Sequence, residues 1–297
     1  MTPDGPEGIA LVDKPSGWTS HDVVAKSRGM LGTRKVGHAG TLDPEATGLL
    51  VLGVGRATRL LTFLSGLDKT YTGEAVFGVA TSTLDASGEV TGTWDMGAVT
   101  LEQVRAGAAT LTGTIGQVPP MVSAKKVGGR RLHELARAGV EVERAAVEVR
   151  VMRFDVGPTA TAEPGVFPIT VTCSSGTYVR SLVADLGTAL GGGAHLRNLR
   201  RLSVGPFSVD EAVPLTGLGP ELVAPPLTAF RGREPAVAED DLAAMVRHGR
   251  VLARGRLAIP EDADGPWPVV DGSGALLAVY VAHRGDTVKP AVVLASP

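Results

Sequence analysis

At residues 37–50 the chain carries the stretch GHAGTLDPEATGLL, in which a glycine-rich loop leads into an apolar segment. Leu49 to Leu52 is a continuous apolar run, which predicts a buried strand. The loop before it holds Asp43 directly ahead of Pro44. Taken alone, an aspartate in this setting is more often a turn or cap residue than a catalyst. The role of Asp43 therefore depends on the rest of the chain.

The segments on either side of this stretch predict strands with occasional helices between them. Ser20 is predicted to cap a helix whose apolar positions, from Val23 to Leu31, follow a spacing of three and four. Further strands are predicted at residues 9–12, 71–79, 147–156 and 166–173, and further helices at residues 100–111, 130–138 and 177–190. Because strands and helices do not alternate regularly, the pattern predicts an α+β fold with a mostly antiparallel sheet.

A proline-rich segment from Pro214 to Pro235 has little periodicity and is the best candidate for a domain boundary. We expect a disordered tail over residues 1–7, a large domain over residues 8–232 and a small, mainly β domain over residues 233–297. The small domain should contain a helix near residues 239–247 and strands at residues 276–281 and 288–294.

Composition excludes several classes of protein. With 297 residues and 43% hydrophobic content, the chain can bury one large core. The single cysteine, Cys173, excludes an internal disulfide framework and reads as a small buried residue in a strand. No apolar run reaches the length of a membrane span, and the polar N-terminus lacks the pattern of a signal peptide. We expect a cytoplasmic protein without a membrane partner.

No pattern for a cofactor or metal stands out. Gly53-Val54-Gly55 resembles part of a dinucleotide fingerprint, but Thr58 occupies the third glycine position and no β-α-β unit surrounds it. The six histidines are scattered without a metal-ligand spacing, and the chain lacks a Gly-Lys-Ser/Thr phosphate loop. We therefore expect neither a metal nor a cofactor.

Four blocks, in order along the chain, resemble those of the TruB-type pseudouridine synthases. They are residues 13–20 (DKPSGWTS), 37–50 (quoted above), 68–71 (DKTY) and 173–180 (CSSGTYVR). The resemblance covers roughly residues 8–213 and is specific because four blocks match together. It implies a pseudouridine synthase core with a mixed, largely antiparallel sheet and a reaction without cofactor or metal. The substrate it implies is one uridine in the T-loop of tRNA, position 55 in tRNA numbering.

The same resemblance assigns catalytic roles to three residues. Asp43 matches the nucleophile, and a nucleophilic carboxylate that must stay ionised in a closed site needs a cation nearby. Arg180 matches the arginine that pairs with it. Tyr71 matches the tyrosine that stacks on the target base and is expected to help remove its C5 proton. Without the resemblance, these residues would read as a turn, a surface ion pair and core packing.

Other matched positions concern the pocket. His38 resembles the histidine that supports the loop after the target base has left its stack, and we expect positioning rather than proton transfer. Lys14 and Pro15 are expected to shape the pocket floor. Tyr178 and Leu199 match pocket residues, although either could be ordinary core.

A phosphate backbone needs a local positive surface rather than a positive whole protein, so basic clusters are compatible with RNA binding at a formal net charge of −2. Residues 116–145 match the position of the insertion that clamps the T-arm of tRNA in this family. The two clusters are Lys125, Lys126, Arg130 and Arg131 in that insertion, and Arg197, Arg200 and Arg201 further along. The C-terminal domain resembles an RNA-binding PUA domain in length, position and β character only. The plainer interpretation of each basic cluster is a solvated charged face, and that of the C-terminal domain is a structural cap.

Two other functions stay open at this point. The chain could mainly help tRNA to fold, with catalysis secondary, or it could be a guide-RNA-dependent relative that modifies ribosomal RNA with protein partners. The joint presence of Asp43, Tyr71 and Arg180 favours catalysis, and the insertion at residues 116–145 favours a stand-alone enzyme. We expect a monomer that binds the T-arm without an obligate protein partner.

Overall fold

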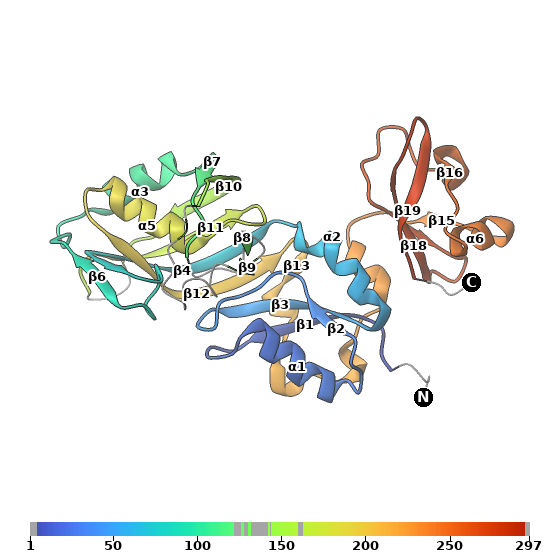
Figure 1. The fold of residues 1–297 in the computed structure, drawn as a ribbon, viewed down its shortest axis with the longest axis horizontal. Coiled ribbons are helices and arrows are strands. Elements are labelled where there is room, and N and C mark those ends of the chain that lie inside the picture. Colours follow the sequence, from blue (N-terminus) through green and yellow to red (C-terminus); the bar gives the residue numbers. More distant parts are fainter. Residues whose placement is uncertain are drawn as a thin grey trace. The chain divides into compact units, whose positions relative to one another are not determined.

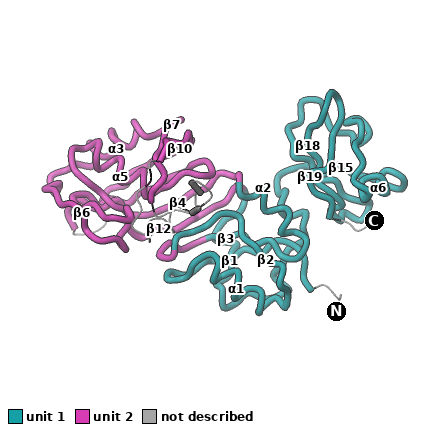
Figure 2. The backbone as a smooth tube through the Cα atoms, viewed as in Figure 1, with its two compact units in different colours: residues 1–43, 49–65, 206–297 teal, residues 44–48, 66–205 magenta. Residues whose placement is uncertain are grey.

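The computed structural model describes residues 5–121, 126–127, 130–131, 142, 144–159 and 163–294. The backbone forms two compact units (Figure 2). Unit 1 comprises Met1–Asp43, Leu49–Ser65 and Pro206–Pro297, and unit 2 comprises Pro44–Gly48 and Gly66–Gly205. The stretch that contains Asp43 is therefore divided between the two units directly after this residue.

The N-terminal part of unit 1 is a small sheet with helices packed beside it (Figure 1). Strand β1 (Gly8–Lys14) lies between β14 (Val213–Pro214) and β3 (Thr47–Val54), and β2 (Val36–His38) pairs antiparallel with β3. The helices are α1 (Ser20–Met30), the 3-10 helix η1 (Gly55–Leu60) and α2 (Leu61–Ser65). One hydrophobic core joins α1 to the sheet, formed by Ala10, Val12, Val23, Val24, Leu31, Val36, Leu50, Leu52, Val54, Leu215 and Leu218.

Helix α1 begins differently from the sequence prediction. Its cap is Thr19, whose hydroxyl accepts from the amide of Asp22 at 3.1 Å, while Asp22 accepts from the Thr19 amide at 2.9 Å. This reciprocal pair is a capping box. Ser20, the predicted cap, is the first helical residue, and its hydroxyl is used elsewhere. The helix therefore begins one residue earlier than predicted, with Thr19 as its cap.

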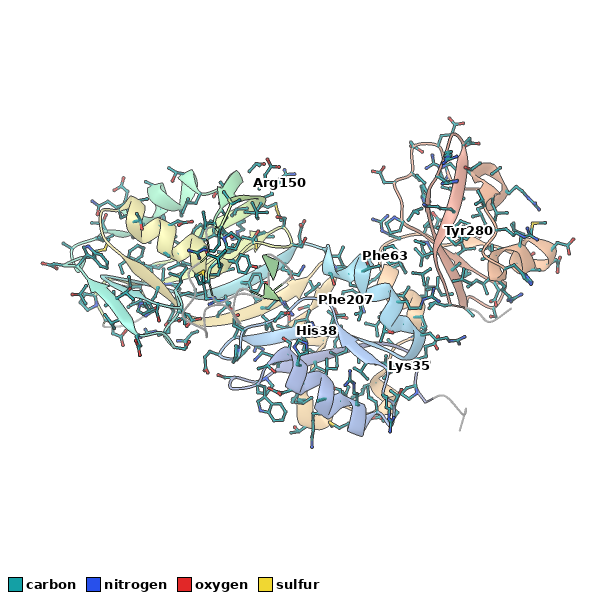
Figure 3. All side chains as sticks on the ribbon, viewed as in Figure 1. Lys35, His38, Phe63, Arg150, Phe207 and Tyr280 are labelled. Atoms are coloured by element: carbon teal, nitrogen blue, oxygen red, sulfur yellow. The ribbon has the colours of Figure 1, made fainter. Side chains whose placement is uncertain are left out.

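The C-terminal part of unit 1 is a five-stranded sheet in the order β15-β17-β18-β19-β16, with helix α6 (Asp240–Arg247) packed on β18 and β19 (Figure 1). Its strands are β15 (Ala236–Val237), β16 (Leu252–Ala253), β17 (Trp267–Val270), β18 (Leu276–Ala282) and β19 (Thr287–Val293). Tyr280 lies fully buried in its core (labelled in Figure 3), and the phenol donates a hydrogen bond to the carbonyl of Arg250 at 2.9 Å. Shorter elements complete this unit: β13 (Phe207–Ser208), η2 (Val209–Glu211), η3 (Leu215–Gly217), η4 (Pro220–Leu222), η5 (Pro226–Phe230) and η6 (Arg254–Leu257).

Unit 2 is built on an antiparallel sheet in the order β12-β4-β11-β10-β7. These strands are β4 (Lys69–Phe77), β7 (Gly113–Gln117), β10 (Val147–Val156), β11 (Val166–Cys173) and β12 (Ala194–Val204). Along β4 every second side chain is buried, which is the pattern of a sheet with one face on a core. Thr47 and Gly48, the first residues of β3, add a short parallel pairing to β12, so the sheet is mixed.

The covered face of this sheet carries two helices (Figure 1). Helix α5 (Val179–Ala189) packs on β12, helix α3 (Leu101–Thr110) packs on β10, and the two helices contact each other. Two small antiparallel ribbons, β5 (Val79–Thr81) with β6 (Val90–Thr93) and β8 (Lys126–Val127) with β9 (Arg130–Arg131), complete the described part of unit 2. The apolar stripe of α5 explains its position, because Leu182, Val183 and Leu186 are all fully buried.

The predicted α+β class with a mostly antiparallel sheet is confirmed. The strands predicted at residues 147–156 and 166–173 match β10 and β11 in both bounds. The helix predicted at residues 130–138 is wrong at Arg130 and Arg131, which pair in β9, and its other residues lie outside the described part. None of the described helices is long and apolar enough to cross a lipid bilayer.

Candidate active site

In unit 1 the loop that leads to Asp43 is fixed at two points. The amide of Ala39 donates to the carbonyl of Val51 at 2.9 Å, which extends the β2–β3 pairing by one bond. The amide of Leu42 donates to the hydroxyl of Ser20 at 2.8 Å, and the same hydroxyl donates to the carbonyl of Leu42 at 3.2 Å. Ala39 and Leu42 are buried while Asp43 is half-buried. The loop therefore has a rigid base and a partly exposed carboxylate at its end.

His38 ends β2 directly before this loop (Figure 3). Its half-buried ring meets the ring of His21 edge-on, with 5.5 Å between ring centroids and an interplanar angle of 83°. His21 belongs to α1, so the contact joins the strand to the start of the helix. This geometry suits a positioning role for His38, which stays a prediction.

Lys14 is fully buried at the end of β1 and stabilises the turn that follows it. Its ammonium donates to the carbonyl of Pro15 at 2.9 Å and to the carbonyl of Trp18 at 2.6 Å. A buried ammonium requires such acceptors. The described contacts place Lys14 in the support of the residue 15–18 turn, whereas Pro15 itself is exposed. The expected role of Lys14 and Pro15 in shaping the pocket floor stays a prediction.

In unit 2, Tyr71 lies on the buried side of β4, between Val171 of β11 and Arg201 of β12. Arg201 has no exposed surface. Lys69, two residues before Tyr71 on the same face, is also buried and donates to the carbonyl of Leu67 at 2.6 Å. Burial and the nearby Arg201 guanidinium lower the pKa of Lys69 to about 8. The strand thus brings one aromatic and two buried basic side chains together.

Arg180 lies near the start of α5 with only 4% of its surface exposed. Its Nη1 donates to the carbonyl of Thr83 at 2.8 Å and lies 3.3 Å from Oδ2 of Asp85. A buried guanidinium held by a carbonyl and a carboxylate has little freedom to turn. The pairing expected between Arg180 and Asp43 joins residues of different units and stays a prediction.

Asp85 is a functional candidate that the sequence pattern did not single out. Its Oδ1 accepts from the hydroxyl of Thr83 at 2.6 Å, and from the amide of Ser87 at 3.0 Å and its hydroxyl at 2.6 Å. One oxygen is thus tied into the turn between β5 and β6 while the other faces Arg180. The local sequence Asp85-Ala86-Ser87-Gly88 is typical of a turn, and nothing in it reveals the arginine that this turn meets.

Gln117 is a second residue that the sequence did not reveal. It is buried at the end of β7 and holds the backbone of Tyr178 from both sides. Its side-chain oxygen accepts from the Tyr178 amide at 2.8 Å, and its side-chain nitrogen donates to the Tyr178 carbonyl at 3.1 Å. The clamp fixes the start of α5, and with it Arg180. Tyr178 and Leu199 are half-buried, and their pocket roles stay predictions.

The second basic cluster is partly neutralised. Arg197 forms ion pairs with Glu74 at 2.7 Å and Glu163 at 2.9 Å, and these hydrogen bonds raise its pKa. Arg200 is half-buried and donates to the Thr47 hydroxyl at 3.5 Å. Arg201 is fully buried, so Arg197 and Arg200 are the members of this cluster that expose surface.

The first basic cluster lies mostly outside the described part of the chain. Lys125 is not among the described residues. Lys126 belongs to β8, and Arg130 and Arg131 to β9, where only the backbone is described. Of the insertion expected at residues 116–145, residues 122–125, 128–129, 132–141 and 143 lie outside the described part. The clamping role of this segment stays a prediction.

Comparison with known families decides the assignment. A family model described as TruB family pseudouridylate synthase (N terminal domain) matches residues 28–179, and one described as tRNA pseudouridylate synthase B C-terminal domain matches residues 180–223. The chain belongs to the TruB family of pseudouridylate synthases. It is therefore a pseudouridine synthase, an enzyme of the isomerase class.

Similarity to TruB-family relatives extends over nearly the whole chain. The tRNA pseudouridine synthase B of Streptomyces coelicolor is 48% identical and covers 97% of both chains. That of Arthrobacter sp. is 47% identical, covering 97% of this chain and 96% of the relative, and that of Thermobifida fusca is 45% identical, covering 97% and 99%.

Solved structures share the fold. A chain of the crystal structure of a Cbf5-Nop10-Gar1 complex matches with a TM-score of 0.74 at 24% identity, covering 98% of this chain and 86% of that one. A chain of the archaeal box H/ACA sRNP Nop10-Cbf5 complex matches with a TM-score of 0.67 at 23% identity, covering 98% and 87%. The fold is thus the pseudouridine synthase α+β core with a small, β-rich, PUA-like sheet at the C-terminus.

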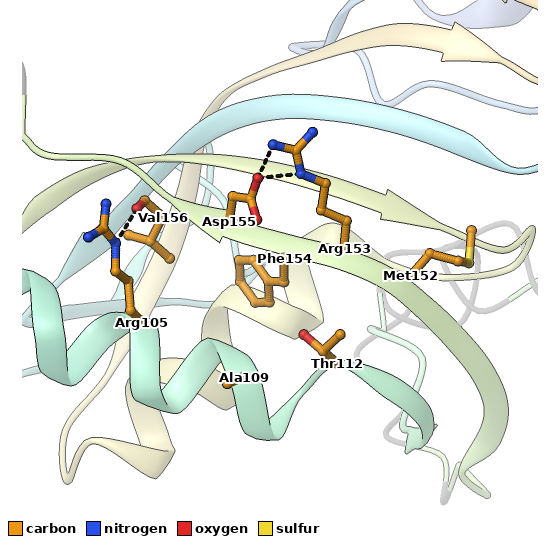
Figure 4. A pocket seen from close by; sticks show the side chains of 8 residues that line it. All are labelled: Arg105, Ala109, Thr112, Met152, Arg153, Phe154, Asp155 and Val156. Atoms are coloured by element: carbon orange, nitrogen blue, oxygen red, sulfur yellow. Dashed lines mark hydrogen bonds and ion pairs between the residues drawn. The ribbon is translucent and has the colours of Figure 1, made fainter.

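Unit 2 also contains an open cavity that is lined by residues outside the four sequence blocks. It measures about 690 Å³ and lies between α3 and β10 (Figure 4). Arg105 on its wall donates to the carbonyl of Val156 at 2.8 Å, and Arg153 is paired with Asp155. Among the described residues, no group of three or more histidine, cysteine or acidic side chains could hold a metal ion.

Proposed function

We propose that the chain converts the uridine at position 55, in the T-loop of tRNA, to pseudouridine, with Asp43 as the nucleophile. Support for tRNA as the substrate comes from the family model for tRNA pseudouridylate synthase B and from curated relatives of that name. The observation that carries the catalytic part is the anchored loop of unit 1. Its base is fixed at Ala39 and Leu42, so the half-buried carboxylate of Asp43 is held in place yet remains accessible.

The reaction explains why a carboxylate is needed. Isomerisation breaks the bond between N1 and ribose C1′, turns the base, and joins C5 to C1′. The C5 proton leaves and N1 gains one, so the atoms balance. A carboxylate suits attack on an electrophilic carbon of the nucleotide, which either the base or the sugar offers.

Arg180 is proposed to keep Asp43 ionised. A nearby cation lowers the pKa of a carboxyl group, which keeps it nucleophilic when the bound RNA excludes water. The contacts to Thr83 and Asp85 hold the guanidinium of Arg180 in a defined position, and a planar guanidinium is the side chain best suited to binding a carboxylate. Asp85 then acts as a positioning residue for the guanidinium.

Tyr71 is proposed to stack on the target base and to help remove the C5 proton. A base that is turned during the reaction needs a flat partner that tolerates several orientations, which an aromatic ring provides. The phenol oxygen offers a proton acceptor once C5 is bonded to the ribose. Pairing with Val171 and Arg201 on both sides fixes the backbone of Tyr71 in the middle of the sheet.

The target uridine must leave the folded T-loop to reach Asp43. Extrusion of a base costs stacking energy, which contacts in the pocket and on the phosphates must offset. We propose that His38 supports the opened loop, that Arg200 contacts a phosphate, and that residues 116–145, with Lys125, Lys126, Arg130 and Arg131, close over the T-arm.

The C-terminal domain is proposed to extend the RNA contact. Its segment over residues 247–256 contains four arginines and one histidine but no acid. Arg250 and Arg256 are exposed, and Arg256 contacts only the Met245 sulfur in the described structure. Tyr280 fixes the backbone of this segment through the Arg250 carbonyl. A rigid, exposed basic segment suits a phosphate backbone.

The site of modification tests this proposal. Full-length tRNA transcripts, wild type and with uridine 55 replaced by cytidine, are incubated with the enzyme, and each uridine is then scored for conversion. We expect one pseudouridine at position 55 and none in the replaced transcript. Conversion elsewhere would overturn the substrate assignment, and tight binding without conversion would favour a tRNA-folding helper. We also expect a monomer that works in the cytoplasm without an obligate protein partner.

A further inference from the structure

Ser20 connects the first sequence block to the loop of Asp43. Its side chain is fully buried at the start of α1, and its hydroxyl both accepts from the amide of Leu42 and donates to the carbonyl of Leu42. We infer that Ser20 is a positioning residue for Asp43, because its hydroxyl orients the peptide that carries the nucleophile. The inference rests on the role proposed above for Asp43.

The two hydrogen bonds act on consecutive peptide planes. The amide of Leu42 belongs to the peptide that joins it to Thr41, and its carbonyl belongs to the peptide that joins it to Asp43. The bonds measure 2.8 and 3.2 Å, so one oxygen holds both planes. Since peptides are planar, fixing the second plane limits the directions in which the Asp43 side chain leaves the backbone.

Ser20 can perform this task because its own position is fixed. The capping box of Thr19 and Asp22 fixes the first turn of α1, and the buried ammonium of Lys14 holds the Trp18 carbonyl at 2.6 Å. A continuous set of contacts therefore runs from β1 through the start of α1 to the residue before Asp43. It gives the DKPSGWTS block a physical connection to the catalytic loop.

A second serine on the same helix shows what an ordinary buried hydroxyl does. Ser27 is also fully buried, but its hydroxyl donates to the carbonyl of Val23 at 2.8 Å, one turn earlier in α1. That bond stays inside the helix and touches no loop. Ser20 and Ser27 share residue type, helix and burial, so they differ mainly in what the hydroxyl holds.

The test compares Ser20→Ala with Ser27→Ala in the full chain. A displacement of about 1 Å at a reacting group costs roughly 100-fold in rate, so we expect Ser20→Ala to lower the single-turnover rate constant on a T-arm hairpin by about 10- to 100-fold. The Kd for the hairpin should change by less than about twofold, since the hydroxyl is buried and cannot reach RNA. Ser27→Ala should alter neither quantity by more than about twofold. Ser20→Thr retains a hydroxyl and should recover at least part of the rate.

Hydrogen exchange gives a second readout that does not depend on activity. In Ser20→Ala the amide of Leu42 loses its acceptor, so the peptide covering residues 41–43 should exchange faster while the Ala39 amide keeps its protection. An unchanged rate constant in Ser20→Ala, a loss seen only in Kd, or an equal loss in Ser27→Ala would overturn the inference. Full activity of Asp43→Asn would instead overturn the proposed nucleophile. An inactive Asp43→Asn with an active Ser20→Ala would overturn the role of Ser20 alone.

Discussion

Replacement of Asp85 by asparagine should weaken both the stability of unit 2 and the catalytic step. The Oδ2 atom of Asp85 lies 3.3 Å from Nη1 of Arg180, whose side chain is 5% exposed. Asparagine has nearly the same shape, and its side-chain oxygen can still accept from Thr83 and Ser87 within the turn. The substitution therefore removes the negative charge beside Arg180 and leaves the turn largely intact.

The magnitude follows from the distance and the burial. Two unit charges 3.3 Å apart attract each other by about 5 kcal/mol at an effective dielectric constant of about 20. Asp85 is 19% exposed, so water screens part of this attraction, and Arg180 keeps its bond to the Thr83 carbonyl. Removing one partner of a buried pair costs about 3 to 5 kcal/mol. With these reductions we expect Asp85→Asn to lower the free energy of unfolding by about 2 to 3 kcal/mol.

Chemical denaturation measures this loss, and single-turnover release of tritium from C5-labelled uridine measures the catalytic effect. We expect the rate constant to fall by about 100-fold with a nearly unchanged Kd for the T-arm, because Arg180 loses its orientation. Asp155→Asn is a matched control. Asp155 is paired with Arg153, but both side chains are about half exposed, and such pairs contribute about 0 to 1 kcal/mol.

Wild-type stability in Asp85→Asn would show that the ion pair contributes nothing to unit 2. A wild-type rate constant would show that Arg180 does not need Asp85 for orientation. If either quantity stays at its wild-type value in Asp85→Asn, as it should in Asp155→Asn, the reasoning from burial and distance is refuted.

Three further predictions concern other parts of the chain. Burial lowers the pKa of Lys69 from 10.5 to about 8, so between these two pH values the folded protein has released this proton while the unfolded protein retains it. The free energy of unfolding of the wild type should therefore rise with pH relative to that of Lys69→Met, by up to about 3 kcal/mol. Denaturation curves from pH 7 to 10.5 that show a constant difference between the two proteins would contradict the burial argument. Gly48→Ala should destabilise unit 2 by at least about 2 kcal/mol, because φ at Gly48 is +100° and the new Cβ would lie 2.2 Å from the Arg201 carbonyl oxygen. Gly66→Ala is the control, since its Cβ would meet open space, and thermal denaturation should show no change for it. The double variant Arg250→Glu and Arg256→Glu should weaken binding of full-length tRNA at least about tenfold. It should also reduce the slope of the logarithm of the binding constant against the logarithm of the salt concentration by about 2. Unchanged affinity and slope would indicate that the C-terminal sheet is a structural cap.

Local patterns were sufficient for most of the fold. The alternation in β10 and β11 and the apolar stripe of α5 predict these elements because burial on one face is visible in the sequence itself. Ser20 was predicted as the cap of α1 because serine is a favourable cap residue, but the neighbouring Thr19 is favourable as well. The choice of Thr19 depends on Leu42, which binds the Ser20 hydroxyl from another part of the chain.

The site was predictable only where a residue belongs to a recognisable block. Asp43, Tyr71 and Arg180 were proposed as site residues because their neighbours match a family, and no spacing rule would have related them. Asp85 and Gln117 were not identified from the sequence, because Asp85 lies in a common turn pattern and Gln117 lies at an ordinary strand end. Their importance comes from the groups they meet, Arg180 and the Tyr178 backbone, and such long-range contacts exist only in the folded chain.

The role of Asp43 is the central claim, and Asp43→Asn tests it most directly. The variant is incubated in excess over a T-arm hairpin labelled with tritium at C5 of the target uridine, and release of label and binding are measured on the same samples. We predict no release above the no-enzyme control and a Kd within about threefold of wild type, since asparagine keeps the shape of the side chain and loses its nucleophilic charge. Release at the wild-type rate would contradict the assignment of Asp43 as the nucleophile.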